Sequence, residues 1–124
     1  MAKININDVR AFVPASNFAA SKAFYVALGW NLQWSDERLA LMEVADKRFY
    51  LQNYYEKTWA DNFVLFVAVD DAQACFERVS ELIESKQFPG VRATPPKLEP
   101  FGAKVTYVWD PSGVLLQFAQ WTRD

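Results

Sequence analysis

The hydrophobic residues of this chain switch between strand-like alternation and helical spacing, and the switch occurs twice in the same order. In the first half, an extended stretch at residues 9–15 precedes a predicted helix that Ser16 or Asn17 can cap and Gly29 ends. One face of this helix carries Ala20, Phe24, Ala27 and Leu28. Three extended runs follow, at residues 31–36, 38–45 and 48–55. The first half is therefore predicted to be a βαβββ unit.

The second half repeats this order of elements. An extended run at residues 63–69 leads to a second predicted helix, capped by Asp70 or Asp71. The apolar stripe of that helix consists of Cys75, Phe76, Val79, Leu82 and Ile83. Three more extended runs follow, at residues 91–94, 104–109 and 114–121, with a proline-rich loop at 95–102. Identical residues recur at one constant offset: Phe12 and Phe66, Val13 and Val67, Ala20 and Ala74, Leu28 and Leu82. We therefore predict an internal duplication.

The last extended run follows a predicted tight turn, Asp110 to Gly113. Pro111 fixes φ near the value that a turn needs, and the glycine can supply a positive φ. Beyond the turn, one face of the strand is predicted to carry Leu115, Gln117, Ala119 and Trp121. The other face carries Val114, Leu116 and Phe118. Gln117 is thus a neutral amide among apolar neighbours, at a place where a carboxylate would allow chemistry.

The composition is that of one globular domain. Of the 124 residues, 52% are hydrophobic and 23% are charged, with both signs mixed along the chain. We expect a single domain with a first module at about residues 4–57 and a second at about 62–122. The net charge of −2 and the lack of a basic cluster argue against a nucleic-acid partner. The first ten residues lack an apolar stretch, and no window of about 18 apolar residues occurs, so we expect no membrane partner and a cytoplasmic location.

The residues that most often carry enzyme chemistry are scarce. The chain has no histidine, and its single cysteine, Cys75, cannot form an internal disulfide. Without imidazole, Ser/His/Asp triads and Cys/His dyads are excluded, and the usual nitrogen ligand of zinc is absent. We interpret Cys75, on the apolar stripe of the second helix, as a core residue.

Several stretches together resemble one known superfamily. In chain order they read NFAASKAFYVALGW, RFYLQNYY, VAVDDAQACFERV, PPKLEPFG and WDPSGVLLQFAQ. They resemble the glyoxalase, bleomycin-resistance and extradiol-dioxygenase superfamily, also called the vicinal oxygen chelate proteins, over nearly the whole chain. The resemblance implies an α+β fold in which two βαβββ modules have curled mixed sheets that form a cup. Because the superfamily supports many functions, the resemblance leaves the activity open.

Enzymes of this superfamily usually hold a divalent metal in the cup with His and Glu side chains from the first and fourth strands of each module. Carried over residue by residue, these positions hold Arg10, Val64, Gln117 and either Tyr50 or Gln52. Arginine and valine have no lone pair to donate, and a neutral amide oxygen or a phenol is a poor metal ligand. The resemblance therefore implies a protein without a metal and without a cofactor.

Metal-free members of the superfamily resemble the bleomycin-resistance proteins, small dimers that sequester a drug in an aromatic groove and catalyse nothing. We therefore predict a homodimer that sequesters an aromatic or drug-like small molecule. The predicted ligand-binding residues are Arg10, Tyr50, Gln52, Tyr54, Trp59, Phe101, Trp109 and Gln117. Tyr50, Gln52 and Tyr54 share one side of a strand, as a cup lining would, and Phe101 and Glu99 are expected at the rim.

Other interpretations of these residues stay open. Each tryptophan can serve a core or a dimer contact, and Tyr50 and Gln52 can satisfy each other in a solvated sheet face. Arg10 can pair with Glu43; unpaired, it would favour an anionic or carbonyl-bearing ligand and repel a cationic drug. The proline-rich loop is either a stiff lid or a plain solvated connection.

Two further functions compete with sequestration. A metal-free lyase or isomerase would use Tyr50, Arg10 or Glu43 as acid, base or oxyanion partner. A tyrosine with an ordinary pKa near 10 is a weak base at neutral pH, so such an enzyme needs a perturbed phenol. The third possibility is a subunit or regulatory module with a vestigial cup.

Overall fold

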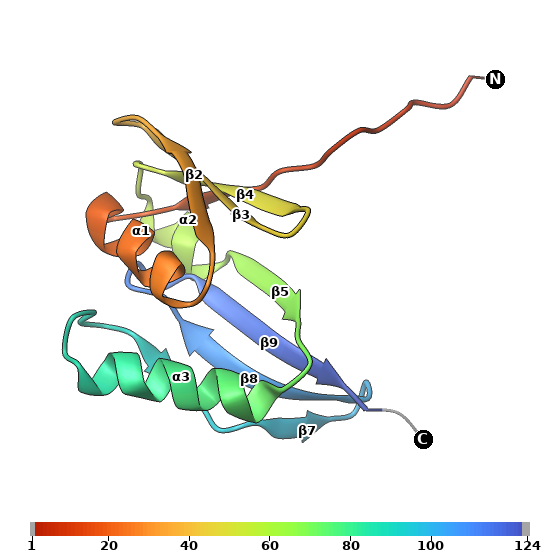
Figure 1. Cartoon of the computed structure of the whole chain (residues 1–124), viewed down its shortest axis with the longest axis vertical. Coiled ribbons are helices and arrows are strands. Elements are labelled where there is room, and N and C mark those ends of the chain that lie inside the picture. Colours follow the sequence, from red (N-terminus) through yellow and green to blue (C-terminus); the bar gives the residue numbers. More distant parts are fainter. Residues whose placement is uncertain (1, 123–124) are drawn as a thin grey trace.

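The computed structural model describes residues 2–122, which form two mixed β-sheets and three helices (Figure 1). The first sheet has the order β1-β4-β3-β2 and consists of β1 (Phe12–Pro14), β2 (Asn31–Ser35), β3 (Leu39–Val44) and β4 (Lys47–Gln52). The second has the order β5-β9-β8-β6, with β7 also paired to β8. Its strands are β5 (Val64–Ala68), β6 (Arg92–Ala93), β7 (Lys97–Glu99), β8 (Ala103–Trp109) and β9 (Leu115–Trp121). The helices are α1 (Phe18–Ala27), α2 (Lys57–Asp61) and α3 (Ala72–Glu84).

Each sheet is built by one half of the chain. In both halves the first strand pairs in parallel with the last, β1 with β4 and β5 with β9, and the remaining pairs are antiparallel. The order βαβββ therefore occurs twice, with β7 as an additional strand in the second half, and the predicted α+β fold is confirmed. Both sheets stay open rather than closing into a barrel.

Local sequence signals set the ends of the two long helices. The Asn17 side chain accepts a hydrogen bond from the Ala20 N–H at 3.0 Å, and the Asp71 side chain accepts one from the Ala74 N–H at 3.0 Å. Asn17 and Asp71 are therefore the N-caps, and the alternative caps predicted from the sequence, Ser16 and Asp70, are not. Gly29 follows α1 with a φ of 110°, a conformation that favours glycine. None of the helices in residues 2–122 is long and apolar enough to cross a membrane.

Two elements differ from the sequence prediction. Residues 95–102 were expected as a loop, but Lys97–Glu99 form β7, antiparallel to β8. Pro95 and Pro96 precede this strand, where their missing N–H groups break no ladder bond. The short helix α2, between the two halves, was not predicted; it has no side-chain cap, which is the signal used for the other helices.

The alternation within the strands divides each sheet into an inner and an outer face. Inner residues are buried, such as Met42 on β3, Leu51 on β4 and Leu116 on β9. They join α1 and α3 residues in one core that both halves share, and Cys75 packs against this core as expected. The opposite side of each sheet, which none of the three helices in residues 2–122 covers in this way, is called the outer face below. Residues on this face include Phe12, Trp34, Leu41 and Tyr50 on the first sheet and Phe66, Tyr107, Trp109, Gln117 and Trp121 on the second.

A buried polar contact joins α1 to the turn before β9. The Tyr25 hydroxyl donates a 2.7 Å hydrogen bond to Asp110 Oδ2, and neither residue is exposed. Asp110 Oδ1 accepts the Ser112 and Val114 N–H groups at 2.7 and 3.1 Å. Burial raises the pKa of Asp110, although these hydrogen bonds oppose the shift. The predicted Asp110 to Gly113 turn is thus also a contact between the two halves.

Candidate functional site

A row of apolar and aromatic side chains crosses all four strands of the first outer face. Tyr50 on β4 lies opposite Phe12 on β1 and Leu41 on β3, and Leu41 lies opposite Trp34 on β2. The Phe12 and Tyr50 rings are 5.1 Å apart. Phe12 and Trp34 remain 43% and 49% exposed, so their rings are available to a planar ligand.

Arg10 lies beside this row and its charge is compensated. Its Nη1 donates to the Tyr50 hydroxyl at 2.6 Å and its Nε donates to Asp8 Oδ2 at 2.9 Å. The hydrogen bond to Asp8, and then that to Tyr50, raise the pKa of Arg10. The Arg10 guanidinium therefore reaches the predicted site already paired.

The sequence analysis named Glu43 as a candidate partner of Arg10, and this assignment was wrong. Glu43 instead pairs with Arg48 Nε at 2.5 Å, because Arg48 lies directly opposite Glu43 in the β3–β4 register. Asp8, two residues from Arg10 in the chain, also lies 3.7 Å from Arg48 Nη1. Two arginines and two carboxylates thus form one balanced cluster at the end of the first outer face.

A hollow of about 330 Å³ lies at the other end of this face. Gln52 and Tyr54 line it together with Phe12 and Leu39. Trp59, on α2, lies near Tyr54, with the two ring centres 6.1 Å apart and the ring planes tilted by 45°. Five predicted site residues, Arg10, Tyr50, Gln52, Tyr54 and Trp59, therefore lie on or beside the first sheet.

The second outer face holds the amide that the sequence singled out. Gln117 lies opposite Phe66 on one side and Tyr107 on the other. The Tyr107 hydroxyl donates to Glu99 on β7, and this hydrogen bond raises the pKa of Tyr107. Trp109, one step along the same face, carries the Arg92 guanidinium 4.3 Å from its ring centre. The predicted residues Gln117 and Trp109 therefore share this face.

An aromatic cluster on this face was missed by the sequence analysis. The Trp121 ring lies 5.8 Å from that of Phe66 and 5.9 Å from that of Phe101. These rings are 49%, 49% and 53% exposed for Trp121, Phe66 and Phe101. Only Phe101 was predicted as a site residue. The signal for Trp121 was present, because the alternation of β9 places it on the same side as Gln117.

The register relates the two faces. Phe12 lies opposite Tyr50, and Phe66, its counterpart in the repeat, lies opposite Gln117. Tyr50 is therefore the structural counterpart of Gln117. Of the two residues that the sequence alignment left open, Tyr50 and Gln52, Tyr50 is the one at this register position. Arg10 and Val64 stand two residues before Phe12 and Phe66 in the same way. Within residues 2–122, no three His, Cys, Asp or Glu side chains gather as a metal site would require.

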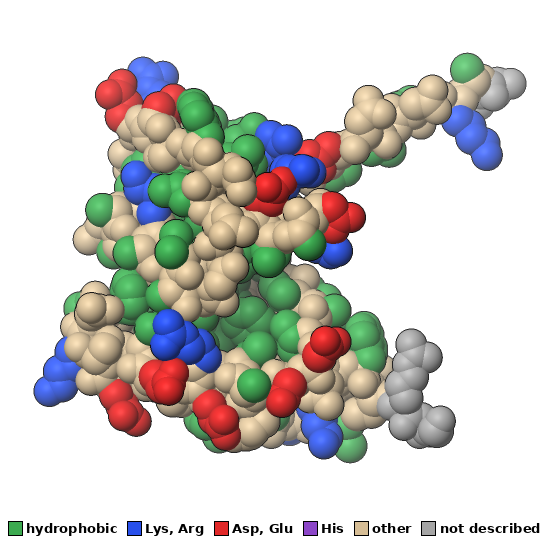
Figure 2. Space-filling model, in the orientation of Figure 1, with side chains coloured by type: hydrophobic (Ala, Val, Ile, Leu, Met, Phe, Trp, Pro, Cys, Tyr) green, Lys and Arg blue, Asp and Glu red, His purple; other side chains and the backbone are tan. Residues whose placement is uncertain are grey.

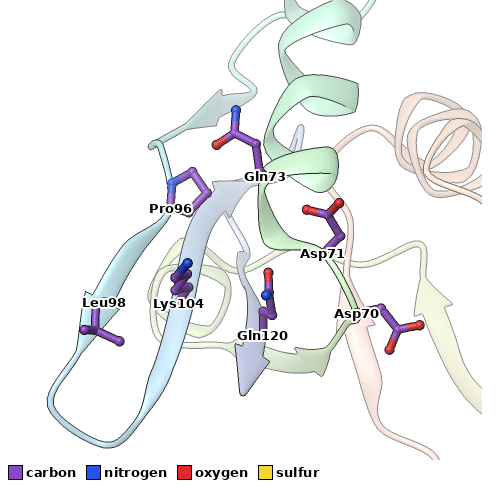
Figure 3. A pocket seen from close by; sticks show the side chains of 7 residues that line it. All are labelled: Asp70, Asp71, Gln73, Pro96, Leu98, Lys104 and Gln120. Atoms are coloured by element: carbon purple, nitrogen blue, oxygen red, sulfur yellow. The ribbon is translucent and has the colours of Figure 1, made fainter. Parts of the chain in front are cut away.

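A different hollow, of about 490 Å³, lies on the helix side of the second sheet (Figure 3). Lys104 and Gln120 lie opposite each other across β8 and β9, and Asp71 stands at the start of α3. The Gln120 side chain accepts a hydrogen bond from the Ala72 N–H at 2.9 Å. None of the predicted site residues lines this hollow, so it is separate from the two outer faces.

Comparison with known proteins supports the arrangement of the elements. No family model matches this sequence, and no curated protein matches it. A bleomycin-binding protein from bleomycin-producing Streptomyces verticillus, complexed with copper(II)-bleomycin, superposes with a TM-score of 0.79 at 22% identity, over 97% of this chain and all of that chain. The chain has the bleomycin-binding protein fold.

Two further solved structures agree with this fold. The antibiotic-binding protein TnmS3 from Streptomyces sp. CB03234 matches with a TM-score of 0.78 at 23% identity, over 97% of this chain and 100% of that chain. A bleomycin resistance determinant encoded on the transposon Tn5 matches with a TM-score of 0.75 at 20% identity, over 94% and 100% of the two chains. The fold expected from the sequence resemblance is therefore confirmed.

Proposed function

We propose that this protein is a metal-free small-molecule binding protein that sequesters an aromatic, drug-like ligand. The observation that carries the proposal is the half-exposed aromatic surface of both outer faces, Phe12 and Trp34 on one and Phe66 and Trp121 on the other. Such rings offer large apolar area and stacking geometry to a planar molecule. The shared fold with antibiotic-binding proteins adds to this support.

The complete site is proposed to need two copies of the chain. The predicted residues are divided between two sheets, with Tyr50 and Gln52 on one and Gln117 and Trp109 on the other. A two-fold dimer would let the first outer face of one copy and the second outer face of its partner enclose one ligand. Two equivalent sites would then form per dimer.

The proposed ligand is not restricted to anions. Asp8 compensates Arg10, and Glu43 compensates Arg48, so the cluster does not repel a cationic molecule as a lone arginine would. The three groups that an acid–base mechanism would use, Arg10, Glu43 and Tyr50, are all engaged in contacts of this kind. Arg10 and Glu43 are in ion pairs, and the Tyr50 hydroxyl accepts a hydrogen bond from Arg10. These contacts favour binding over catalysis.

The first prediction concerns metal content. We expect no stoichiometric zinc, nickel, manganese or iron in the purified protein. The chain has no histidine, and Arg10, Val64, Tyr50 and Gln117 stand at the carried-over ligand positions. Elemental analysis after removal of any affinity tag checks this. One tightly held metal per chain would contradict the proposed site.

The second prediction tests binding at the aromatic row. The probe ligands are thioflavin T, a planar cation, and anilinonaphthalene sulfonate, a planar anion. Their binding is followed by the quenching of tryptophan fluorescence. We expect saturable quenching by at least one probe, and Tyr50→Ala should raise its Kd by about tenfold, because a stacking contact and buried area are lost. Mass spectrometry should recover the probe unchanged.

Tyr50→Phe is the matched control, because it keeps the ring and removes only the hydroxyl that Arg10 contacts. Its Kd should stay within about threefold of that of the unmodified protein, since the ring face is retained. If neither probe quenches saturably, or if a probe is converted to product, the sequestration proposal fails.

A further inference from the structure

Arg38 lines the hollow of about 330 Å³ at the end of the first outer face. Within residues 2–122, no carboxylate forms an ion pair with its guanidinium, and its side chain donates no hydrogen bond. Each of the other arginines in this range has a carboxylate or aromatic partner; they are Arg10, Arg48, Arg78 and Arg92. A guanidinium is always charged at neutral pH and donates through several N–H groups, so Arg38 is available to an acceptor on a ligand.

Backbone hydrogen bonds hold Arg38 at the edge of this hollow. Arg38 lies in the hairpin between β2 and β3, where its N–H donates to Asp36 Oδ1 at 2.8 Å. Its carbonyl accepts from the Asn53 N–H at 2.8 Å, one step beyond the paired residues Leu39 and Gln52. Figure 2 shows charged side chains of both signs at the tip of this hairpin, next to hydrophobic ones. The Arg38 backbone is therefore fixed against β4, with its side chain on the hollow.

The acidic residues next to Arg38 in the chain do not take up its charge by ion pairing. Asp36 uses Oδ1 for two backbone N–H groups, those of Leu39 and Arg38, at 2.8 Å each. These two hydrogen bonds lower the pKa of Asp36, and the attraction of the Arg38 charge contributes less to this shift. Neither Asp36 nor Glu37 lines the hollow, and Arg38 is the only charged residue among the described residues that do. The hollow therefore carries a local positive charge.

The other walls of the hollow complement this charge. Phe12 and Tyr54 line it with rings that are 43% and 53% exposed, which offer apolar surface to an aromatic group. Gln52 lines it with an amide, and the Gln52 side chain makes no hydrogen bond within residues 2–122. Such an amide can donate to an acceptor that a guanidinium also binds. The hollow thus combines aromatic rings, a positive charge and a second donor.

We propose that Arg38 binds a carboxylate of the ligand while the rings of Phe12 and Tyr54 contact its aromatic part. The inference rests on the proposed function and specifies the ligand as an aromatic carboxylic acid. A carboxylate matches a guanidinium in charge and shape, because two parallel N–H···O bonds can form. A phosphate would bring a larger negative charge than one guanidinium balances. The net charge of the ligand stays open, because Asp8 compensates Arg10 at the other end of the face.

Two probes that differ only in the carboxylate test the contact on the full chain. They are 2-naphthoate and its neutral amide, 2-naphthamide, and their binding at neutral pH is followed by the quenching of tryptophan fluorescence. Arg38→Gln should raise the Kd of 2-naphthoate about tenfold and change that of 2-naphthamide less than about twofold, because only the carboxylate loses charge-assisted hydrogen bonds. The control Lys104→Gln removes the same charge in the separate hollow of Figure 3 and should leave both Kd values unchanged.

NMR of the arginine Nε–H groups tests the contact without a substitution. Adding 2-naphthoate should shift the Arg38 signal saturably, and 2-naphthamide should not; the signal of Arg78, which pairs with Glu81, is the internal reference. The Arg38 signal is assigned by its loss in Arg38→Gln.

The outcomes separate the carboxylate contact from sequestration itself. If 2-naphthoate binds equally well to Arg38→Gln and Lys104→Gln, or leaves the Arg38 signal in place, the contact is overturned while sequestration stands. Equal weakening of both probes by Arg38→Gln also overturns it, because Arg38 would then support the hollow without binding the carboxylate. If neither naphthalene probe binds but thioflavin T or anilinonaphthalene sulfonate does, only the contact is overturned. If none of the four probes binds, both proposals are overturned.

Discussion

Replacing Phe24 by alanine is expected to lower the free energy of unfolding by about 3–5 kcal/mol. Phe24 on α1 is fully buried and packs its ring edge against Phe88, which follows α3 in the second half, at 5.5 Å. Its removal leaves a cavity where the two halves meet, and the surrounding core can collapse only in part. Urea unfolding followed by tryptophan fluorescence measures the change.

Val26→Ala is the matched control for this substitution. Val26 lies on the same helix but is 47% exposed, so its truncation should change the free energy of unfolding by less than about 1 kcal/mol. Equal losses for the two variants would mean that α1 does not bury Phe24 between the halves as described.

Replacing Tyr25 by phenylalanine is expected to cost about 1–3 kcal/mol of unfolding free energy. The substitution keeps the ring and removes only the hydroxyl that donates to Asp110 Oδ2. A fully buried carboxylate oxygen is then left without that donor, and its desolvation is no longer compensated. Chemical denaturation at neutral pH checks this value.

The cost of Tyr25→Phe should depend on pH. Burial raises the pKa of Asp110, whereas the Tyr25 hydroxyl lowers it, so removing that hydroxyl raises the pKa of Asp110 further. A carboxyl group with a raised pKa in the folded state stabilises the fold at low pH, and this contribution is lost as the pH rises through that pKa. The difference between variant and unmodified protein should therefore be largest at neutral pH and decrease on acidification.

Tyr55→Phe provides the control for the loss of a hydroxyl. Tyr55 is 41% exposed, and water replaces any partner that its hydroxyl loses, so its removal should have little effect at any pH. A Tyr25→Phe cost that stays constant between neutral and acidic pH would argue against the assigned role of Asp110.

The balance of charge around Tyr50 bears on which molecules the proposed site accepts. Arg10 and Arg48 are both matched by carboxylates, and Arg92 on the second face is stacked over Trp109. Recognition of a ligand would therefore depend on ring stacking and shape more than on net charge. This expectation explains why probes of both signs are needed in the binding experiment.

Apart from α2 and β7, the sequence alone determined the order of the helices and strands and the face on which the residues of the predicted strands lie. Helix caps such as Asn17 and Asp71 and the Asp110 to Gly113 turn depend on residues a few positions apart, so their signals are readable locally. The alternation of β9 likewise placed Gln117 and Trp121 on one side, because successive side chains of a strand point to opposite faces. The repeat followed from the same signals occurring twice.

Only the tertiary structure decided which residues on those faces are neighbours. Alternation fixes a side of the sheet but not the register with the next strand, so the partners of Arg10 and Glu43 could not be assigned from the sequence. The same reason hid the cluster of Phe66, Phe101 and Trp121, whose members come from β5, the turn before β8, and β9. The division of the predicted site between two sheets depends on strand order, which contacts between residues far apart in the chain determine.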